Sequence, residues 1–222
     1  RVALDKAVEY AAEDADVTPR LHRLLKPRLF AERQTSLYET IERPLVPVLL
    51  AMEGAGIRVD PAALAALSED FARRMADLEG QIHGLAGHEF NLASPKQLGE
   101  ILFDEMGLKG AKKTKTGAYQ TGHEVLEDLA AEGHELPARV LDWRQLQKLK
   151  STYSDALQGQ INSRTGRVHT TFHMAAANTG RLASADPNLQ NIPIRTEEGR
   201  KIRRAFVPAV GCRLLSADYS QI

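Results

Sequence analysis

Residues 178–222 read NTGRLASADPNLQNIPIRTEEGRKIRRAFVPAVGCRLLSADYSQI, and this stretch decides how the rest of the chain is interpreted. It ends on a short apolar run around Leu214 and Leu215 that turns polar at Asp218, a pattern that predicts a buried strand carrying a carboxylate at its end. A strand of that kind holds a metal-binding oxygen rigidly. Upstream lie five side chains that can donate hydrogen bonds over some distance: Arg181, Asn188, Gln190, Asn191 and Arg195. A carboxylate that faces amides and guanidiniums suits a polyanion held beside a metal ion.

Two motifs inside this stretch also carry a resemblance. TGRLASADPNLQNIP at 179–193 and LSADYSQI at 215–222 resemble the entry to the palm of family A DNA polymerases, and the second resembles the family's first catalytic motif. The family's usual next residue, its nucleotide-gripping fingers helix and its later palm carboxylate are not in the sequence. The resemblance therefore implies a piece of a DNA-directed DNA polymerase, a nucleotidyltransferase of replication and repair, and we expect the piece alone to be inactive.

The resemblance implies a role for each residue that it covers. Asp218 would be the catalytic carboxylate that bridges two Mg²⁺ ions, with the carbonyl oxygen of Tyr219 as a further metal ligand. Gln221 and Ile222 would line the nucleotide site, and Arg181 would contact the minor groove at the primer terminus. The template and primer backbones would be supported by Asn188, Gln190, Asn191 and Arg195. The alternative for this last cluster is a polar loop that stabilises its own turns.

Three further stretches resemble the DNA-contacting parts of the family's thumb. They are FNLASPKQL at 90–98 with Asn91 and Ser94, KKTKTGAYQT at 112–121 with Lys113, Thr114 and Thr116, and the helix before and through QKLKSTY at 147–153 with Arg144, Lys148 and Lys150. Each has a structural alternative: a helix cap at Ser94 and Gln97, a solvated mobile loop at 107–122, and a solvated basic helix face at 144–150.

Bulk composition describes an ordinary globular protein and does not by itself predict a partner. The 222 residues are 43% apolar and 26% charged, with 29 basic and 29 acidic side chains. Basic charge is concentrated locally, with four lysines and no acid in 109–115 and five basic against two acidic residues in 195–204. Cys212 is the single cysteine, which fits a reducing cytoplasm, and no apolar run approaches the length of a membrane span.

Helix signals recur along the chain. Residues 1–35 and 42–53 have helical patterns, with Thr18 as a predicted N-cap before Pro19. Asp60 and Pro61 predict the start of a long amphipathic helix that Gly87 ends. Further helices are expected at 94–102, after a cap at 121–124, at 137–158 and at 197–205, whereas alternation of Val168, Thr170 and Phe172 predicts a half-buried strand.

At the N-terminal end, Tyr10 and Asp14 lie four residues apart, so that both side chains share one helix face. YAAED at 10–14 resembles the third motif of the 3′–5′ proofreading exonuclease domain. The structural alternative is an exposed acid beside a half-buried tyrosine.

Together these patterns predict an α+β fold that is mainly α-helical. The resemblance implies its division into an exonuclease-domain remnant at 1–40, an elongated helical thumb at 41–165, and the first strands of a palm at 166–222. We expect a cytoplasmic monomer that contacts no membrane, binds primer–template DNA, and in its complete form takes a dNTP. Two alternatives remain open, a stand-alone helical DNA-binding module and a nuclease built around Tyr10 and Asp14.

Overall fold

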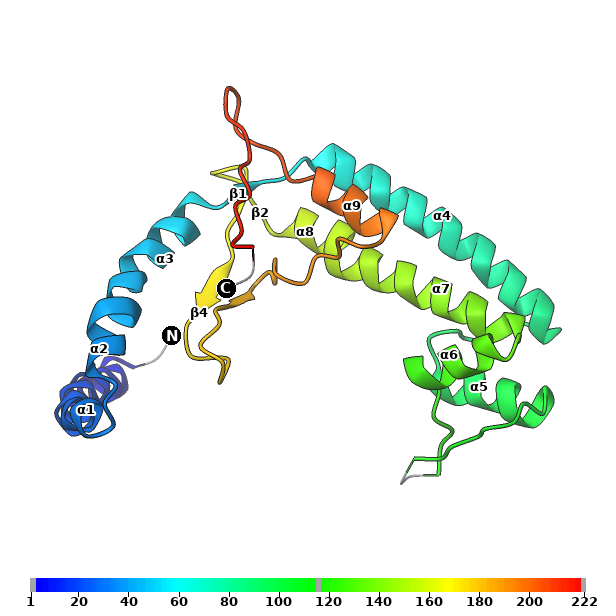
Figure 1. Cartoon of the computed structure of the whole chain (residues 1–222), viewed down its shortest axis with the longest axis horizontal. Helices are drawn as coiled ribbons and strands as arrows, with labels where there is room; N and C mark the ends of the chain where they lie inside the picture. The colour runs from blue at the N-terminus through cyan, green and yellow to red at the C-terminus, as the bar shows by residue number, and fades with distance from the viewer. Residues whose placement is uncertain (1–2, 115–116, 221–222) are drawn as a thin grey trace. The chain divides into compact units, whose positions relative to one another are not determined.

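A computed structural model describes residues 3–114 and 117–220, and the chain divides into two compact units. Unit 1 contains the residues up to Ala55 together with Phe172–Ala183, and unit 2 contains Gly56–Thr171 and the residues from Ser184 onward. The fold is α+β and mainly helical, as the sequence predicts (Figure 1). None of the helices described is both long and apolar enough to cross a membrane.

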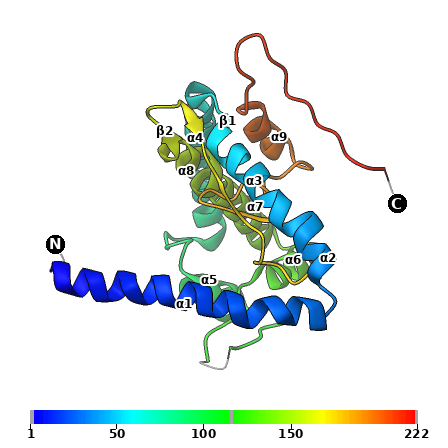
Figure 2. The same cartoon turned by 90° about the vertical axis from the view of Figure 1, so that its left-hand side faces the viewer.

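Unit 1 is helical apart from its short second segment. Its helices are α1 (Leu4–Ala31), α2 (Thr35–Leu37), the π-helical η1 (Tyr38–Glu42) and α3 (Arg43–Ala55). Figure 2 shows α1 as one uninterrupted helix, so the predicted N-cap at Thr18 is wrong. The Thr18 hydroxyl instead donates to the Asp14 carbonyl at 2.8 Å, one turn back, and Pro19 lies inside the helix.

Unit 2 contains most of the remaining regular structure. Its helices are α4 (Pro61–Ala86), α5 (Pro95–Glu100), η2 (Ile101–Glu105), α6 (His123–Ala131), α7 (Glu135–Leu149), η3 (Lys150–Asp155), α8 (Ala156–Gly159) and α9 (Glu197–Arg204). Its strands are β1 (Ile57–Arg58), β2 (Ile161–Asn162) and β3 (Arg167–Val168). Two more short strands, β4 (Thr171–His173) and β5 (Ala183–Ala185), pair with each other.

Two long helical stretches form the frame of unit 2. Helix α4 begins where Asp60 accepts the backbone N–H groups of Ala62 and Ala63, with Pro61 at the first helical position, and it ends at Gly87 with φ of 82°. Helix α7 continues through η3 into α8 without a break, which extends the predicted helix over 135–159. Helices α4 and α7 pack side by side along their lengths (Figure 1).

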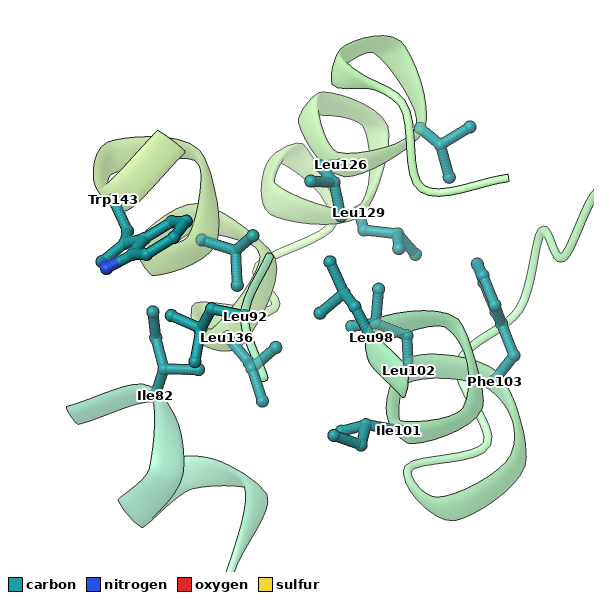
Figure 3. Close-up of a cluster of buried hydrophobic side chains, with 12 residues drawn as sticks. Ile82, Leu92, Leu98, Ile101, Leu102, Phe103, Leu126, Leu129, Leu136 and Trp143 are labelled. Atoms are coloured by element: carbon teal, nitrogen blue, oxygen red, sulfur yellow. The ribbon is translucent and has the colours of Figure 1, made fainter. Parts of the chain in front are cut away.

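The buried apolar side chains of unit 2 form two clusters, one toward each end of the α4–α7 pair. Figure 3 shows the first cluster, in which η2, α6 and α7 close over Ile82 at the end of α4. The second cluster joins Phe71 of α4 to Tyr153 and Leu157 of the α7–α8 stretch and to Ile202 of α9. Each cluster stabilises one part of the unit, so α7 is held against different partners at its two ends.

A small antiparallel sheet and α9 complete the second cluster. The strand order is β1-β3-β2, and Val168 of β3 pairs with Ile57 on one side and Ile161 on the other. The predicted alternation is confirmed in part, since Val168 and Thr170 are buried and Thr171 is exposed, while Phe172 is partly buried. The predicted single strand is divided into β3 and β4, with residues 169–170 in neither. After α9, the Ala205 carbonyl accepts the Asp60 N–H at 2.7 Å, which fixes the end of α9 at the start of α4.

The helix predicted after residues 121–124 is present, but Thr121 is not its N-cap. Helix α6 is present, but its N-cap is Gly122, which has no side chain to supply, and Thr121 is buried one residue earlier. The first amide N–H groups of α6 therefore receive no side-chain cap.

Candidate nucleic-acid interface

Three cations of the α7–η3 stretch are predicted to contact DNA, and the fold gives them different surroundings. Arg144 is half-buried, and its Nη1 donates to the Thr121 carbonyl at 2.5 Å, while burial lowers the pKa of the guanidinium. Lys148, one turn further on, is exposed. Lys150 Nζ lies 2.7 Å from Oδ2 of Asp155, so its charge is matched within the chain.

Arg144 borders a large hollow in unit 2. This Arg144 hollow, about 870 Å³, lies between the starts of α5 and α6 and one face of α7. Its polar lining includes Thr114, Gln120, His123, Glu124, Arg144 and Gln147. The uncapped first turn of α6 also lines it, through Gly122. The structure thus brings Thr114 and Arg144, which lie thirty residues apart in sequence, to one concave surface.

Lys148 borders a second hollow. This Lys148 hollow, about 440 Å³, is lined by Gln145, Lys148 and Thr152 from the α7–η3 stretch and by Asn188, Asn191, Pro193 and Thr196 from the segment before α9. Tyr153 lies at its base, where it is 4% exposed and donates its hydroxyl to the Asn191 carbonyl at 2.5 Å. Burial raises the pKa of Tyr153, so the phenol stays protonated and remains a donor.

Asn91 and Ser94 lie in a turn that is bonded to itself. The Asn91 Oδ1 accepts the Ala93 N–H at 2.9 Å, and the Ser94 Oγ accepts the Gln97 N–H at 3.4 Å, which confirms Ser94 as a helix cap. The Gln97 Oε1 accepts the Asn91 N–H at 2.7 Å, where a capping box would bring it to Ser94. The turn therefore presents the Asn91 side chain with one polar end already bonded.

The lysine-rich loop is tied at its base by Tyr119. The Tyr119 hydroxyl donates to Asp104 at 2.5 Å, which raises the pKa of Tyr119, and its ring packs against Phe103 with the centroids 5.0 Å apart. Lys113 lies over the same ring, with Nζ 4.8 Å from its centroid, and the Thr114 N–H donates to the Ala118 carbonyl. Thr116 lies outside the described residues.

The predicted polar cluster before α9 is divided between local turns and the hollow. Asn188 Oδ1 accepts the Gln190 N–H at 3.0 Å, and Gln190 Oε1 accepts the Ser184 N–H at 3.1 Å. Asn188 and Asn191 also line the Lys148 hollow, and Arg195 is exposed nearby in sequence. Arg181 is exposed and belongs to unit 1.

The predicted buried strand before Asp218 is wrong. Residues 213–220 have no strand in the structure; Leu215 is 92% exposed and Tyr219 is 90% exposed. A strand is stabilised by hydrogen bonds to a neighbour, and no strand pairs with this segment among the described residues. Asp218 is thus held on an exposed, extended segment, and Gln221 and Ile222 lie outside the described residues.

Two further predictions concern metal binding and the exonuclease motif. Within residues 3–114 and 117–220, no three His, Cys, Asp or Glu side chains lie close enough together to hold a metal ion. Tyr10 and Asp14 share a face of α1, and both are exposed, Tyr10 at 70%.

The sequence analysis identified neither the hydrogen-bond acceptor of the Tyr153 hydroxyl nor the burial of Trp143. Trp143 is 7% exposed in the first core cluster and lines the Arg144 hollow. Tyr153 is predictable as a buried residue from its helical position, and a buried phenol needs a hydrogen-bond partner. That partner is a main-chain carbonyl 38 residues away, which no local pattern indicates.

Comparison with known proteins identifies the family of this chain and several of its relatives. The family model described as DNA polymerase family A matches residues 61–222. DNA polymerase I of Rhizobium leguminosarum is 59% identical over 221 residues, covering all of this chain and 22% of the relative, and DNA polymerase I of Pseudomonas aeruginosa is 54% identical, covering all of this chain and 24% of the relative. The thermostable DNA polymerase I of Thermus aquaticus is 50% identical over 96% of this chain and 26% of its own.

A solved structure, the POL domain of Pol1 from M. smegmatis in complex with DNA primer-template and dNTP, superposes with a TM-score of 0.77 at 43% identity, covering 84% of this chain and 33% of that one. The chain described here belongs to DNA polymerase family A. It spans about a quarter of the length of the curated relatives that it matches.

Proposed function

We propose that this chain is the part of a DNA-directed DNA polymerase that holds the primer–template duplex and supplies one catalytic carboxylate. The observation that carries the proposal is the pair of polar hollows along α7, one bordered by Thr114 and Arg144 and the other by Lys148, Asn188 and Asn191. Both hollows offer cations or amide donors, as a phosphate backbone requires. Membership of family A supports the reading of these donors as duplex contacts.

Family membership also supports an assignment of each part of the chain to a polymerase subdomain. We infer that residues 41–165 form a thumb, that 166–222 begin a palm, and that 1–40 are the end of an exonuclease-like domain with Tyr10 and Asp14 as its remnant motif. Asn91, Ser94, Lys113 and Thr116 would extend the duplex contacts toward the thumb tip. Arg181 would contact the primer terminus, Gln190 and Arg195 would support the template and primer backbones, and Gln221 and Ile222 would line the site of the incoming dNTP. We place this monomeric enzyme in the cytoplasm, where its DNA substrate lies.

For catalysis we infer a divalent metal site that includes Asp218, with Mg²⁺ as the ion. The Asp218 carboxylate and the Tyr219 carbonyl are oxygen donors of the kind that Mg²⁺ prefers, and the exposure of both residues leaves them accessible to an ion. A single carboxylate binds Mg²⁺ weakly, so further ligands are needed to complete the site. Bound ions would activate the primer 3′-hydroxyl and stabilise the leaving pyrophosphate. The part of this chain is to hold one negative charge at Asp218 and to position the duplex beside it.

The duplex-binding proposal is tested by the salt dependence of binding. In the full-length protein, fluorescence anisotropy with a labelled primer–template should show affinity falling steeply with salt and no preference for sequence. Lys148→Ala should lower the slope of log K against log salt by about 0.9, the value for one lost phosphate contact. Lys6→Ala, an exposed lysine on α1, is the matched control and should leave the slope unchanged. Equal slopes for wild type and Lys148→Ala would contradict the contact.

The catalytic proposal is tested by Asp218→Asn in the full-length protein. The change keeps the size of the side chain and one oxygen but removes the charge, so duplex affinity should stay about the same while single-turnover incorporation falls about a thousandfold or more. Arg181→Ala should instead cost roughly ten- to a thousandfold by misplacing the primer terminus. Incorporation by Asp218→Asn within about tenfold of wild type would show that Asp218 is not a metal ligand.

A further inference from the structure

Five consecutive main-chain carbonyls before α9 accept hydrogen bonds from side chains. Residues 191–195 have neither helical nor strand pairing, so their carbonyls need partners from elsewhere. Tyr153 Oη donates to the carbonyl of Asn191 at 2.5 Å. Arg203 donates through Nη2 to Ile192 at 2.7 Å and through Nε to Pro193 at 3.1 Å. Arg200 donates through Nε to Ile194 at 3.3 Å and through Nη2 to Arg195 at 2.9 Å.

This arrangement uses the planar guanidinium in a particular way. Arg200 and Arg203 lie three residues apart on α9 and therefore share a face, and each spans two successive carbonyls with two N–H groups. Lysine has one nitrogen at its end and does not reproduce this fork. Gly199 completes the contact, because the Pro193 carbonyl oxygen lies only 2.5 Å from where a Cβ would stand. Helix α9 thus binds the main chain of the segment directly.

We propose that Tyr153, Arg200 and Arg203 form a clamp, in which they act as positioning residues that hold the main chain of residues 191–195. The two arginines then do not serve as phosphate ligands. The inference rests on the proposed duplex-binding function, since the held segment carries Asn191 and Arg195 and continues from Asn188. It reassigns part of the basic charge of 195–204, because Arg200 and Arg203 are occupied by the chain's own carbonyls. Arg195 of that stretch, together with Lys148 of α7, stays available to meet the duplex.

Tyr153→Phe tests the positioning role most cleanly. Tyr153 is 4% exposed and neutral, so the variant removes one hydroxyl donor without changing the ring packing or the charge presented to DNA. We expect primer–template affinity of the full-length protein to fall by about three- to tenfold, the loss expected for one hydrogen bond, at an unchanged salt slope. An unchanged affinity would show that holding this segment does not contribute to duplex binding.

The arginines are tested by a pair of substitutions on the same helix. Arg203→Lys keeps the charge and loses the fork, so affinity should fall by about tenfold with the salt slope unchanged. Arg204→Ala, the matched control, removes one charge from the neighbouring exposed position and should leave affinity within about twofold. If Arg203→Lys binds like wild type while Arg203→Ala lowers the slope by about 0.9, Arg203 is a phosphate ligand and the proposal is wrong.

A readout that does not involve DNA separates this inference from the proposed function. Trypsin cleavage after Arg195, followed by mass spectrometry on the full-length protein, should be several-fold faster in Tyr153→Phe and Arg203→Lys than in wild type, because the segment is less firmly held. If cleavage is faster in Tyr153→Phe and Arg203→Lys, but DNA binding is unchanged in these variants and in Lys148→Ala, the clamp is supported and the proposed duplex contact is contradicted. Unchanged cleavage would contradict the clamp itself.

Discussion

At the scale of single residues, three cations of equal charge do different work because the fold surrounds them differently. Lys148 projects into solvent beside the Lys148 hollow, whereas Lys150 is matched by Asp155 at 2.7 Å. Burial by itself raises the pKa of Asp155, but hydrogen bonds from Lys150 and Ser68 outweigh it, so the pKa lies below its usual value. Arg144 donates one of its N–H groups to the Thr121 carbonyl. Of the three, Lys148 is the most accessible to a phosphate.

We expect Arg144→Ala to reduce stability as well as DNA affinity. The change removes a charged donor from the Thr121 carbonyl, and a lost hydrogen bond of that kind in a half-buried site costs about 1–2 kcal/mol. Lys148→Ala, one turn away and exposed, should change the free energy of unfolding by less than about 0.5 kcal/mol. Urea unfolding of the two variants beside wild type measures both values, and equal stabilities for the two variants would contradict the role of the Thr121 contact.

At the scale of secondary-structure elements, the docking of α9 depends on a glycine. A Cβ at Gly199 would lie 2.5 Å from the carbonyl oxygen of Pro193 and 2.6 Å from the Cβ of Pro193. Gly199→Ala therefore forces either α9 or the segment 191–195 to shift. We expect a loss of about 1–3 kcal/mol in unfolding free energy, typical of overpacking. Gly84→Ala in α4, where the added methyl group would meet nothing within 4 Å beyond its own helix backbone and chain neighbours, should instead raise stability by up to about 1 kcal/mol. Chemical denaturation of both variants checks the opposite signs.

The same helix predicts a pH dependence. Arg74 of α4 donates to Glu198 of α9 at 2.9 Å, and this bond holds the pKa of Glu198 below its ordinary value of 4.5. A depressed folded-state pKa stabilises the fold above the unfolded pKa, and the contribution is lost as pH falls from 4.5 through the folded value.

We therefore expect Glu198→Gln to be less stable than wild type at pH 7, with the difference shrinking as the pH falls below 4.5. Unfolding free energies across this range provide the measurement. Glu197→Gln, at an exposed position of the same turn, is the control. A difference between Glu198→Gln and wild type that stays constant with pH would rule out the ion pair as its source.

Element ends are predictable where the signal lies within the element itself. Asp60 with Pro61, and Gly87 after the last apolar position, define both ends of α4, and the structure confirms them. Thr18 with Pro19 has the same local pattern as Asp60 with Pro61, yet the hydroxyl of Thr18 bonds backward to Asp14 and the helix continues. A threonine hydroxyl can satisfy either direction, so the pattern alone does not decide between them.

At the scale of the whole molecule, family and helical content are predictable, whereas the surroundings of Asp218 are not. The motifs at 179–193 and 215–222 indicate the family directly, and the family model confirms it. A strand around residues 214–216 would need a hydrogen-bonded neighbouring strand from a distant part of the sequence. The apolar pattern alone does not indicate whether such a neighbour is present. The clamp of Tyr153, Arg200 and Arg203 is unpredictable for a similar reason, because its acceptors are main-chain carbonyls present at every residue.

The last prediction concerns the 222-residue chain alone, which we expect not to extend a primer. Nucleotidyl transfer with two metals requires several carboxylate or carbonyl ligands around the ions. Among the described residues, no three His, Cys, Asp or Glu side chains lie close enough together to hold a metal ion, and Asp218 lies on an exposed segment. The chain also spans about a quarter of its curated relatives.

Primer extension with Mg²⁺ or Mn²⁺ and all four dNTPs should therefore give no product above background. The full-length protein serves as the positive control in the same buffer. Anisotropy on the same preparation should still show salt-dependent duplex binding, which distinguishes an inactive folded chain from an unfolded one. Metal-dependent incorporation that Asp218→Asn abolishes would show that the chain completes the metal site by itself, and the assignment of a single supplied carboxylate would then be wrong.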